Sequence, residues 1–266
     1  MLTRETFART FGRRAVFGMV HLKALPGAPM YAGSIDGVVD AALRDARALA
    51  GGGCDGIGVE NFGDRPFFKT RVPPETIAAM ARVITAIASE VKLPIGVNVL
   101  RNDAHAALAI AAATGAAFIR VNVHTGAMVT DQGIIEGDAA ETLRARSHFA
   151  QHVAIFADHL VKHATPLGSP SAKDLRLRGL ADAIIITGAE TGAAADPQRL
   201  VAVRHEVADA PILIGSGIGE SNASQFADAD GAIVGTAMKR GGDVDADVDQ
   251  KRVEKIVRAF KAAGGR

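Results

Sequence analysis

The chain has 266 residues, of which 48% are hydrophobic and 22% are charged, and its formal net charge is +1. This composition can supply a large buried core, and the near-zero net charge gives no electrostatic reason to expect nucleic-acid binding. The length suits one α/β barrel, which typically has about 250 residues. No linker-like stretch divides the chain, so we expect a single domain over residues 1–266, with residues 1–14 as an N-terminal extension.

The N-terminal segment predicts a short helix, because Phe7 and Phe11 stand four residues apart. We expect this helix to close the lower end of the barrel. Arg13 and Arg14 precede an apolar run, as in a twin-arginine export signal, but the run reaches His21 before it has the length of an export signal. No stretch attains the roughly 20 apolar residues of a membrane span. We therefore expect a cytoplasmic protein without a transmembrane segment, for which peripheral association with a membrane stays open.

Eight short apolar runs alternate with helical patterns along the chain. Several runs, such as residues 184–186, are apolar at consecutive positions, as strands covered on both faces are. Eight repeats favour a (β/α)8 TIM barrel over an open doubly wound sheet, with seven helices between the strands and an eighth after the last. The expected strands are residues 15–22, 56–60, 95–100, 117–123, 153–158, 183–187, 211–214 and 232–234.

The connections after the first, second and fourth strands are long, over residues 23–34, 61–74 and 124–137. Long loops in a compact domain are usually lids or binding loops, and these three would lie at the carboxyl ends of the strands, where barrel active sites are found. The second loop combines three phenylalanines with three cations within residues 62–71. This mixture suits either a lid that closes over an anion or a surface that docks a protein partner.

Polar side chains gather where the strands end. They include His21 and Lys23, Glu60, Asn98 and Arg101, Arg120, Asn122 and His124, and Asp158, His159 and Lys162. The pattern of alternation places Asp158 and Lys162 on one face of the fifth strand. They would form a general acid/base pair or provide an amine for a Schiff base, with Glu60 or His21 assisting, unless they are an ordinary ion pair at the barrel mouth. Asn98 and Asn122 are expected to contact the ligand.

Two glycine-rich turns follow the last two strands, at Gly215, Ser216 and Gly217 and at Gly235 and Thr236. In this fold, those turns commonly bind phosphate, because bare backbone N–H groups let an anion approach closely. Lys239 would add positive charge, and Gly188 lies on the neighbouring loop. The alternative is that the glycines only make tight turns.

Cofactor and metal signals are weak. A dinucleotide fingerprint would need glycine where Glu220 stands, so no nicotinamide cofactor is expected. The best candidates for metal ligands are Glu60, Asp158 and His159. The sequence has neither a His-x-His motif nor a pair of cysteines, so no metal is predicted. The single Cys54 is expected to be inert core packing.

The chain resembles the BtpA family, also called the BtpA/SgcQ family, over nearly its whole length. The resemblance rests on GMVHL (18–22) with LPG (25–27), GVNVLRND (96–103), FIRVN (118–122), TDQGIIEG (130–137), VKH (161–163) and GAETG (188–192). It implies a ribulose-phosphate-binding type of barrel and, from the role that gives the family its name, a part in photosystem I biogenesis. It supplies no catalytic residue.

These observations favour a protein that binds a small phosphorylated ligand, as an aldol-type lyase or an isomerase. The alternative is a non-catalytic factor that assembles or stabilises a membrane complex. A homo-oligomer is expected in either case.

Overall fold

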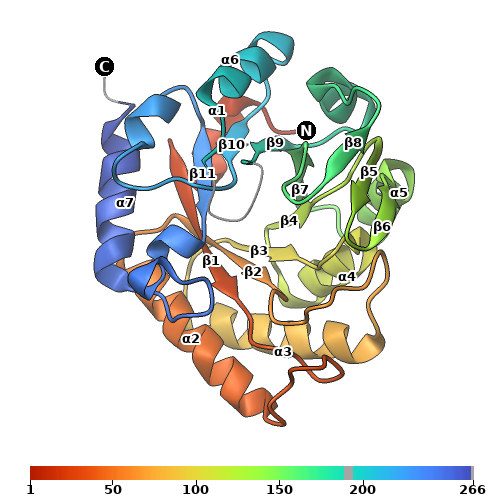
Figure 1. Ribbon diagram of the computed structural model, residues 1–266, viewed down its shortest axis with the longest axis vertical. Coiled ribbons are helices and arrows are strands. Elements are labelled where there is room, and N and C mark those ends of the chain that lie inside the picture. Colours follow the sequence, from red (N-terminus) through yellow and green to blue (C-terminus); the bar gives the residue numbers. More distant parts are fainter. Residues whose placement is uncertain (189–193, 265–266) are drawn as a thin grey trace.

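Eight parallel strands close into a barrel in the computed structural model, which describes residues 1–188 and 194–264 (Figure 1). The barrel closes because β1 pairs with the last strand, with Ala15 opposite Gly231. This confirms the predicted TIM barrel, with each expected strand present to within a few residues. In order around the barrel, the strands are β1 (Ala15–His21), β2 (Gly56–Glu60), β3 (Ile95–Asn98), β4 (Phe118–Val121), β7 (Ala154–His159), β9 (Ala183–Ile186), β10 (Ile212–Ile214) and β11 (Gly231–Val234).

Helices surround the barrel, with two departures from the expected pattern. The long ones are α2 (Ile35–Gly51), α3 (Pro74–Glu90), α4 (Ala104–Thr114), α5 (Ala139–Phe149), α6 (Pro197–Glu206) and α7 (Gln250–Ala262). Between β7 and β9 there is only a π-helical turn, Asp174–Arg178, and between β10 and β11 only a 3-10 turn, Ala223–Phe226. The prediction of full helices at these two places was wrong. Gly168 and Pro170 interrupt the first segment, and the glycine-rich turn uses up much of the second.

Helix α1 (Arg4–Phe11) closes the lower end of the barrel, as its two phenylalanines predict. Phe7 and Phe11 are buried, and Phe11 meets Phe118 edge-on at 5.9 Å between ring centroids. Phe118 in turn stacks on Phe156 at 4.4 Å, and Phe17 completes the cluster. Because aromatic side chains fill this end, a ligand can enter only at the opposite end, where the strands have their carboxyl termini.

A second, antiparallel sheet lies beside the barrel mouth, where the sequence predicted an open loop over residues 124–137. Strands β5 (Ala127–Thr130) and β6 (Gly133–Glu136) form a hairpin, and β8 (Thr165–Leu167) pairs with β5. Gly133 has a φ of +94°, which a tight hairpin turn requires. Met128 and Ile135 turn inward onto Val123. The connections after β4 and β7 are therefore joined by one accessory sheet (Figure 1).

Candidate functional site

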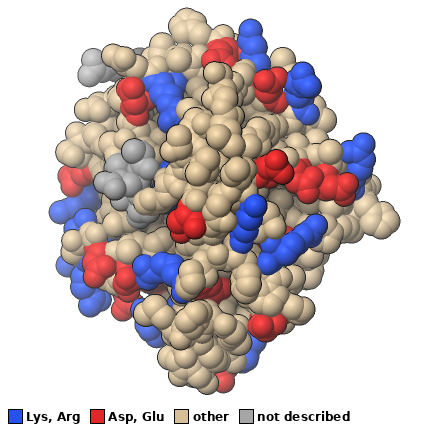
Figure 2. Space-filling model, turned by 45° about the vertical axis from the view of Figure 1, so that its right-hand side comes forward, with Lys and Arg blue, Asp and Glu red and all other residues tan. Residues whose placement is uncertain are grey.

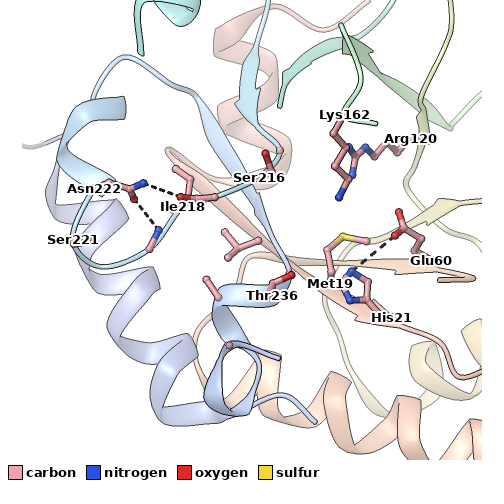
Figure 3. A pocket seen from close by; sticks show the side chains of 17 residues that line it. Met19, His21, Glu60, Arg120, Lys162, Ser216, Ile218, Ser221, Asn222 and Thr236 are labelled. Carbon is pink, nitrogen blue, oxygen red and sulfur yellow. Dashed lines mark hydrogen bonds and ion pairs between the residues drawn. The ribbon is translucent and has the colours of Figure 1, made fainter. Parts of the chain in front are cut away.

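A cavity of about 230 Å³ opens at the carboxyl ends of the strands, and both glycine-rich turns line it. Figure 3 shows the side chains of His21, Glu60, Arg120 and Lys162 across the cavity from these turns. The turn after β10 and the turn after β11 thus face a common space. Two groups of residues that the sequence singled out separately, the glycine turns and four of the ionisable residues at the strand ends, meet there.

Glycine is needed at two of these positions for packing as well. A Cβ on Gly215 would lie 2.4 Å from Ile185 Cγ2, and one on Gly235 would lie 2.9 Å from His21 Cε1. Gly217 has a φ of +66°, a backbone conformation that favours glycine. The tight-turn interpretation is therefore part of the explanation for these glycines, and it is compatible with their place on the cavity wall.

The turn after β10 is held in shape by Asn222. Its Nδ2 donates to the Gly217 carbonyl at 2.8 Å, and its Oδ1 accepts from Gly219 N at 2.9 Å (Figure 3). Ser216 Oγ accepts from Gly188 N at 2.7 Å, so Gly188 braces the turn and does not line the cavity. Asn222 could not be singled out from the sequence, because an asparagine in a polar loop gives no signal until its partners are known.

Free backbone N–H groups remain in the two turns. Among the described residues, no carbonyl accepts from the N–H of Gly217, Gly235 or Thr236. Thr236 begins a 3-10 turn of only three residues, Thr236–Met238, so a helix dipole adds little here and the individual amides are the donors. Lys239 does not support them. It is buried beneath the mouth, with its Nζ 2.7 Å from Asp45 Oδ2, and the prediction that it adds charge to the cavity was wrong.

Arg120 occupies the floor of the cavity and is bound by Asp158. Its Nε and Nη2 each donate to the Asp158 carboxylate at 2.9 Å, and Asn122 Nδ2 donates to the same carboxylate at 3.0 Å. Asn98 Nδ2 donates to Asn122 Oδ1 at 3.3 Å, which places both asparagines in a buried network below the cavity. Asp158 is therefore committed to Arg120.

The expected pairing of Asp158 with Lys162 is not formed. Strand β7 ends at His159, and Leu160 has a φ of +62°, so the two-residue alternation stops before Lys162. Lys162 nevertheless reaches the cavity from the segment between β7 and β8. Its Nζ has no hydrogen bond or ion pair within the described part of the chain. Burial lowers the pKa of this amine, Glu60 raises it, and Arg120 lowers it.

His21 and Glu60 stand next to the amine. His21 Nε2 is 3.9 Å from Glu60 Oε1, and its ring stacks on Phe62 at 4.8 Å. Burial, with smaller effects from Lys239 and Lys162, lowers the pKa of His21 to about 3. The imidazole is thus neutral at physiological pH. An uncommitted amine, a buried carboxylate and a neutral imidazole are together able to form a covalent adduct with a carbonyl and move a proton.

The aromatic and basic loop after β2 folds over this mouth. Phe62 and Phe67 lie 6.4 Å apart, Arg65 lies over the Phe62 ring at 5.0 Å, and Arg65 Nη2 reaches Asp245 Oδ1 at 3.1 Å. Of its phenylalanines only Phe68 is largely exposed, at 58%. Part of the loop is therefore a wall of the mouth, whereas Phe68, Lys69 and Arg71 are exposed, so the lid and the docking surface both stay predictions.

Features of other kinds of site are scarce in the described residues. No three His, Cys, Asp or Glu side chains there converge as a metal ion would require. No helix among residues 1–188 and 194–264 is long and apolar enough to cross a bilayer. On the face drawn in Figure 2, Lys and Arg side chains are interspersed with Asp and Glu. Residues 189–192 of the GAETG motif lie outside the described residues, so only its Gly188 is placed.

Comparisons with known proteins identify the family and the fold. The model of the BtpA family matches residues 12–262. The photosystem I biogenesis protein BtpA of Synechocystis sp. is 47% identical over 250 residues, which cover 92% of this chain and 87% of that protein. An uncharacterized protein of Thermococcus kodakarensis is 46% identical over 254 residues, covering 94% and 97%. The family resemblance is confirmed.

Solved structures with the same fold are far less similar in sequence. The 7,8-dihydropteroate synthase of Vibrio fischeri has a TM-score of 0.62 at 16% identity, covering 96% of this chain and 93% of that one. The N-(5'-phosphoribosyl)anthranilate isomerase of Pyrococcus furiosus has a TM-score of 0.55 at 15% identity, covering 93% and 98%. At this identity, the likeness establishes the barrel and nothing about the reaction.

Proposed function

This chain belongs to the BtpA family, and we propose that it binds a small phosphorylated ligand at its barrel mouth and acts on it as a lyase or an isomerase. The observation that carries the proposal is the shared cavity: the two glycine turns form one side and Lys162, Glu60 and His21 form the other. A phosphate on the first side would place the rest of a small molecule against the second.

The backbone amides of Gly217, Gly235 and Thr236 are the proposed donors to the phosphate. They have no acceptor among the described residues, and an anion would satisfy them without moving a side chain. The Thr236 side chain borders the same space. Arg120 and Lys162 line the same cavity, but Asp158 and Glu60 offset their charges, so the backbone amides would be the main donors to the phosphate.

Lys162 is the proposed nucleophile. Its Nζ would attack a ligand carbonyl carbon, and loss of water from the resulting carbinolamine would give a protonated Schiff base. The positively charged nitrogen then accepts the electron pair of an adjacent C–C or C–H bond as that bond breaks. Burial lowers the pKa of this amine, so more of it is in the nucleophilic neutral form at pH 7 than for an exposed lysine.

Glu60 is the proposed general acid and base, a role that the sequence predicted for Asp158. Both Asp158 oxygens already accept hydrogen bonds from Arg120 or Asn122, so Asp158 positions Arg120. The buried Glu60 faces the amine and the neutral His21. Glu60 would take the proton released by bond cleavage and return it to the product, while the His21 ring packs beside it.

Borohydride reduction tests the covalent step. A panel of three- to six-carbon sugar phosphates is added with borohydride, and the intact mass and the labelled peptide are determined. We expect a stable adduct on Lys162 with at least one ligand, and none in Lys162→Met. Lys173→Met, which removes an exposed lysine, is the matched control. Labelling that is absent across the panel, or that persists in Lys162→Met, would reject the Schiff-base mechanism.

Phosphate binding is tested separately by calorimetry with inorganic phosphate. Thr236→Asp places a negative charge beside the free amides, whereas Thr236→Val keeps the shape without charge. We expect the aspartate variant to lose at least tenfold in affinity and the valine variant to lose much less. Equal affinities in the two variants would show that phosphate does not bind between the turns.

A second candidate function is favoured by the accessory sheet. Val129, Ile134 and Leu167 project from its outer face with 42%, 47% and 49% of their surface exposed, and Val129 lies directly opposite Ile134. Adjacent exposed apolar side chains on one sheet suit a protein interface. This face would serve a non-catalytic assembly factor, in line with the name of the Synechocystis relative, or hold a homo-oligomer together.

Sedimentation and retention of partner proteins test this candidate. Ile134→Lys should convert oligomers to monomers or release the partner, while Val201→Lys, the same kind of change at a half-exposed apolar residue of α6, should do neither. If Ile134→Lys behaves as the unaltered protein in both measurements, the face has no docking role.

A further inference from the structure

A second cavity, of about 410 Å³, adjoins the first at the barrel mouth. The two share Glu60, Arg120 and Lys162, so these side chains stand at the junction. The far part of the second cavity is bordered by Phe62 and Phe67 and by Arg101. A ligand whose phosphate lies between the glycine turns, and which is longer than a few atoms, would pass Lys162 and extend into this space.

Arg101 is the unusual group in the second cavity. Only 6% of its surface is exposed, and the one hydrogen bond that its guanidinium makes to a described residue runs from Nη2 to the Lys162 carbonyl at 2.8 Å. No carboxylate of the described residues forms an ion pair with it. The other guanidiniums of this cavity are matched, Arg120 by Asp158 and Arg65 by Asp245. Burying a charge without a partner is costly, so a buried guanidinium that borders a cavity is suited to an anionic ligand.

The nearby carboxylates of the described residues do not serve as the counterion of Arg101. Burial lowers the pKa of Arg101, and the charges of Asp158, Glu60 and, least of the three, Asp131 raise it. Asp158 binds Arg120, and Glu60 lies beside His21. Asp131 also borders the cavity, but it stands at the exposed tip of the β5–β6 hairpin and accepts a hydrogen bond from its neighbour Gln132.

We propose that the ligand carries a carboxylate in addition to its phosphate, and that Arg101 binds this carboxylate in the second cavity. This inference rests on the proposed function, because the phosphate between the glycine turns sets the direction of the ligand. One guanidinium balances one negative charge, and its planar donors match the two oxygens of a carboxylate. The phenylalanine wall favours a singly charged group over a second, doubly charged phosphate. The substrate class is then a phosphorylated keto acid, with its keto carbon beside Lys162.

Matched pairs of ligands test the proposal by calorimetry on the full chain. 6-Phosphogluconate and sorbitol 6-phosphate have the same chain length and differ in a carboxylate against a hydroxymethyl group. 3-Phosphoglycerate and glycerol 3-phosphate make the same comparison on a shorter chain. We expect the carboxylate member of at least one pair to bind at least tenfold more tightly. In Arg101→Gln the ratio within that pair should fall to about one, and Arg101→Lys should restore part of it.

The outcomes separate this inference from the proposed function. If inorganic phosphate and the alcohol members bind while the carboxylate members bind no more tightly, the carboxylate site is rejected and phosphate binding stands. If no phosphorylated probe binds, the proposed function fails. A preference that survives in Arg101→Gln would also overturn the assignment to Arg101. Should Arg101→Gln fail to fold, the affinity ratio in the unaltered protein still decides whether a carboxylate is recognised.

Discussion

Replacing Asp158 with asparagine should destabilise the protein strongly, although the two side chains have nearly the same shape. The Arg120 and Asp158 side chains are only 5% and 0% exposed, and two 2.9 Å hydrogen bonds join them. Asparagine keeps one acceptor oxygen but removes the negative charge, which leaves the Arg120 guanidinium buried without a counterion. Breaking a buried pair in this way costs about 3–5 kcal/mol. For a chain of this size, 1 kcal/mol corresponds to roughly 2–4 °C in Tm, so the expected decrease is about 6–20 °C.

Urea denaturation and thermal unfolding measure this effect, and the chain provides a matched control. Asp245→Asn makes the same chemical change in an ion pair with Arg65 whose side chains are 44% and 62% exposed. Such a pair contributes about 0–1 kcal/mol, so Tm should hardly change. In the double variant Arg120→Met with Asp158→Leu, neither charge of this pair remains, and much of the loss should be recovered. A decrease in Tm as small in Asp158→Asn as in Asp245→Asn would refute the reasoning.

Three further predictions concern other parts of the barrel. The pKa of His21 is about 3 in the folded protein, below its unfolded value of 6.5, so the protein loses stability as the pH falls below 6.5. Between pH 7 and pH 5, this group should lower the free energy of unfolding by about 2 kcal/mol. Urea titrations at the two pH values should show a decrease that is smaller by this amount in His21→Gln. Burial raises the pKa of Cys54 to about 12, so iodoacetamide should label it only after denaturation, and rapid labelling of the native protein would contradict its burial. Phe11→Ala should cost about 3–5 kcal/mol, because it leaves a cavity among the rings that close the barrel, and an unchanged urea midpoint would show that α1 does not act as a plug.

The barrel could be predicted from the sequence because several of its strands are continuous runs of apolar residues. Buried parallel strands have no polar face, so residues such as Ile184, Ile185 and Ile186 indicate them without any knowledge of their neighbours. The accessory sheet could not be found in this way. Its strands are short, and half of their residues face solvent, where exposed apolar side chains such as Val129 and Ile134 resemble ordinary loop residues.

The sequence predicted which residues meet in the candidate site better than it predicted which of them form ion pairs with one another. Closure of the barrel brings strand ends together whatever their detailed geometry, so His21, Glu60, Lys162 and the glycine turns meet in one cavity. Which carboxylate binds which cation depends on side-chain reach across the barrel and on where a strand ends. A single left-handed residue, Leu160, is enough to separate Asp158 from Lys162, and no period-two pattern can foresee it.

Hydrogen bonds between β5 and β8 join two connections that lie 38 residues apart at the paired positions Met128 and Pro166. In most barrels each connection after a strand can change its length and chemistry independently, which lets one scaffold diversify across many reactions. Here, an insertion in either connection would pull on the other and shift the segment that carries Lys162. Evolution of this mouth is therefore constrained to coordinated changes in these two connections.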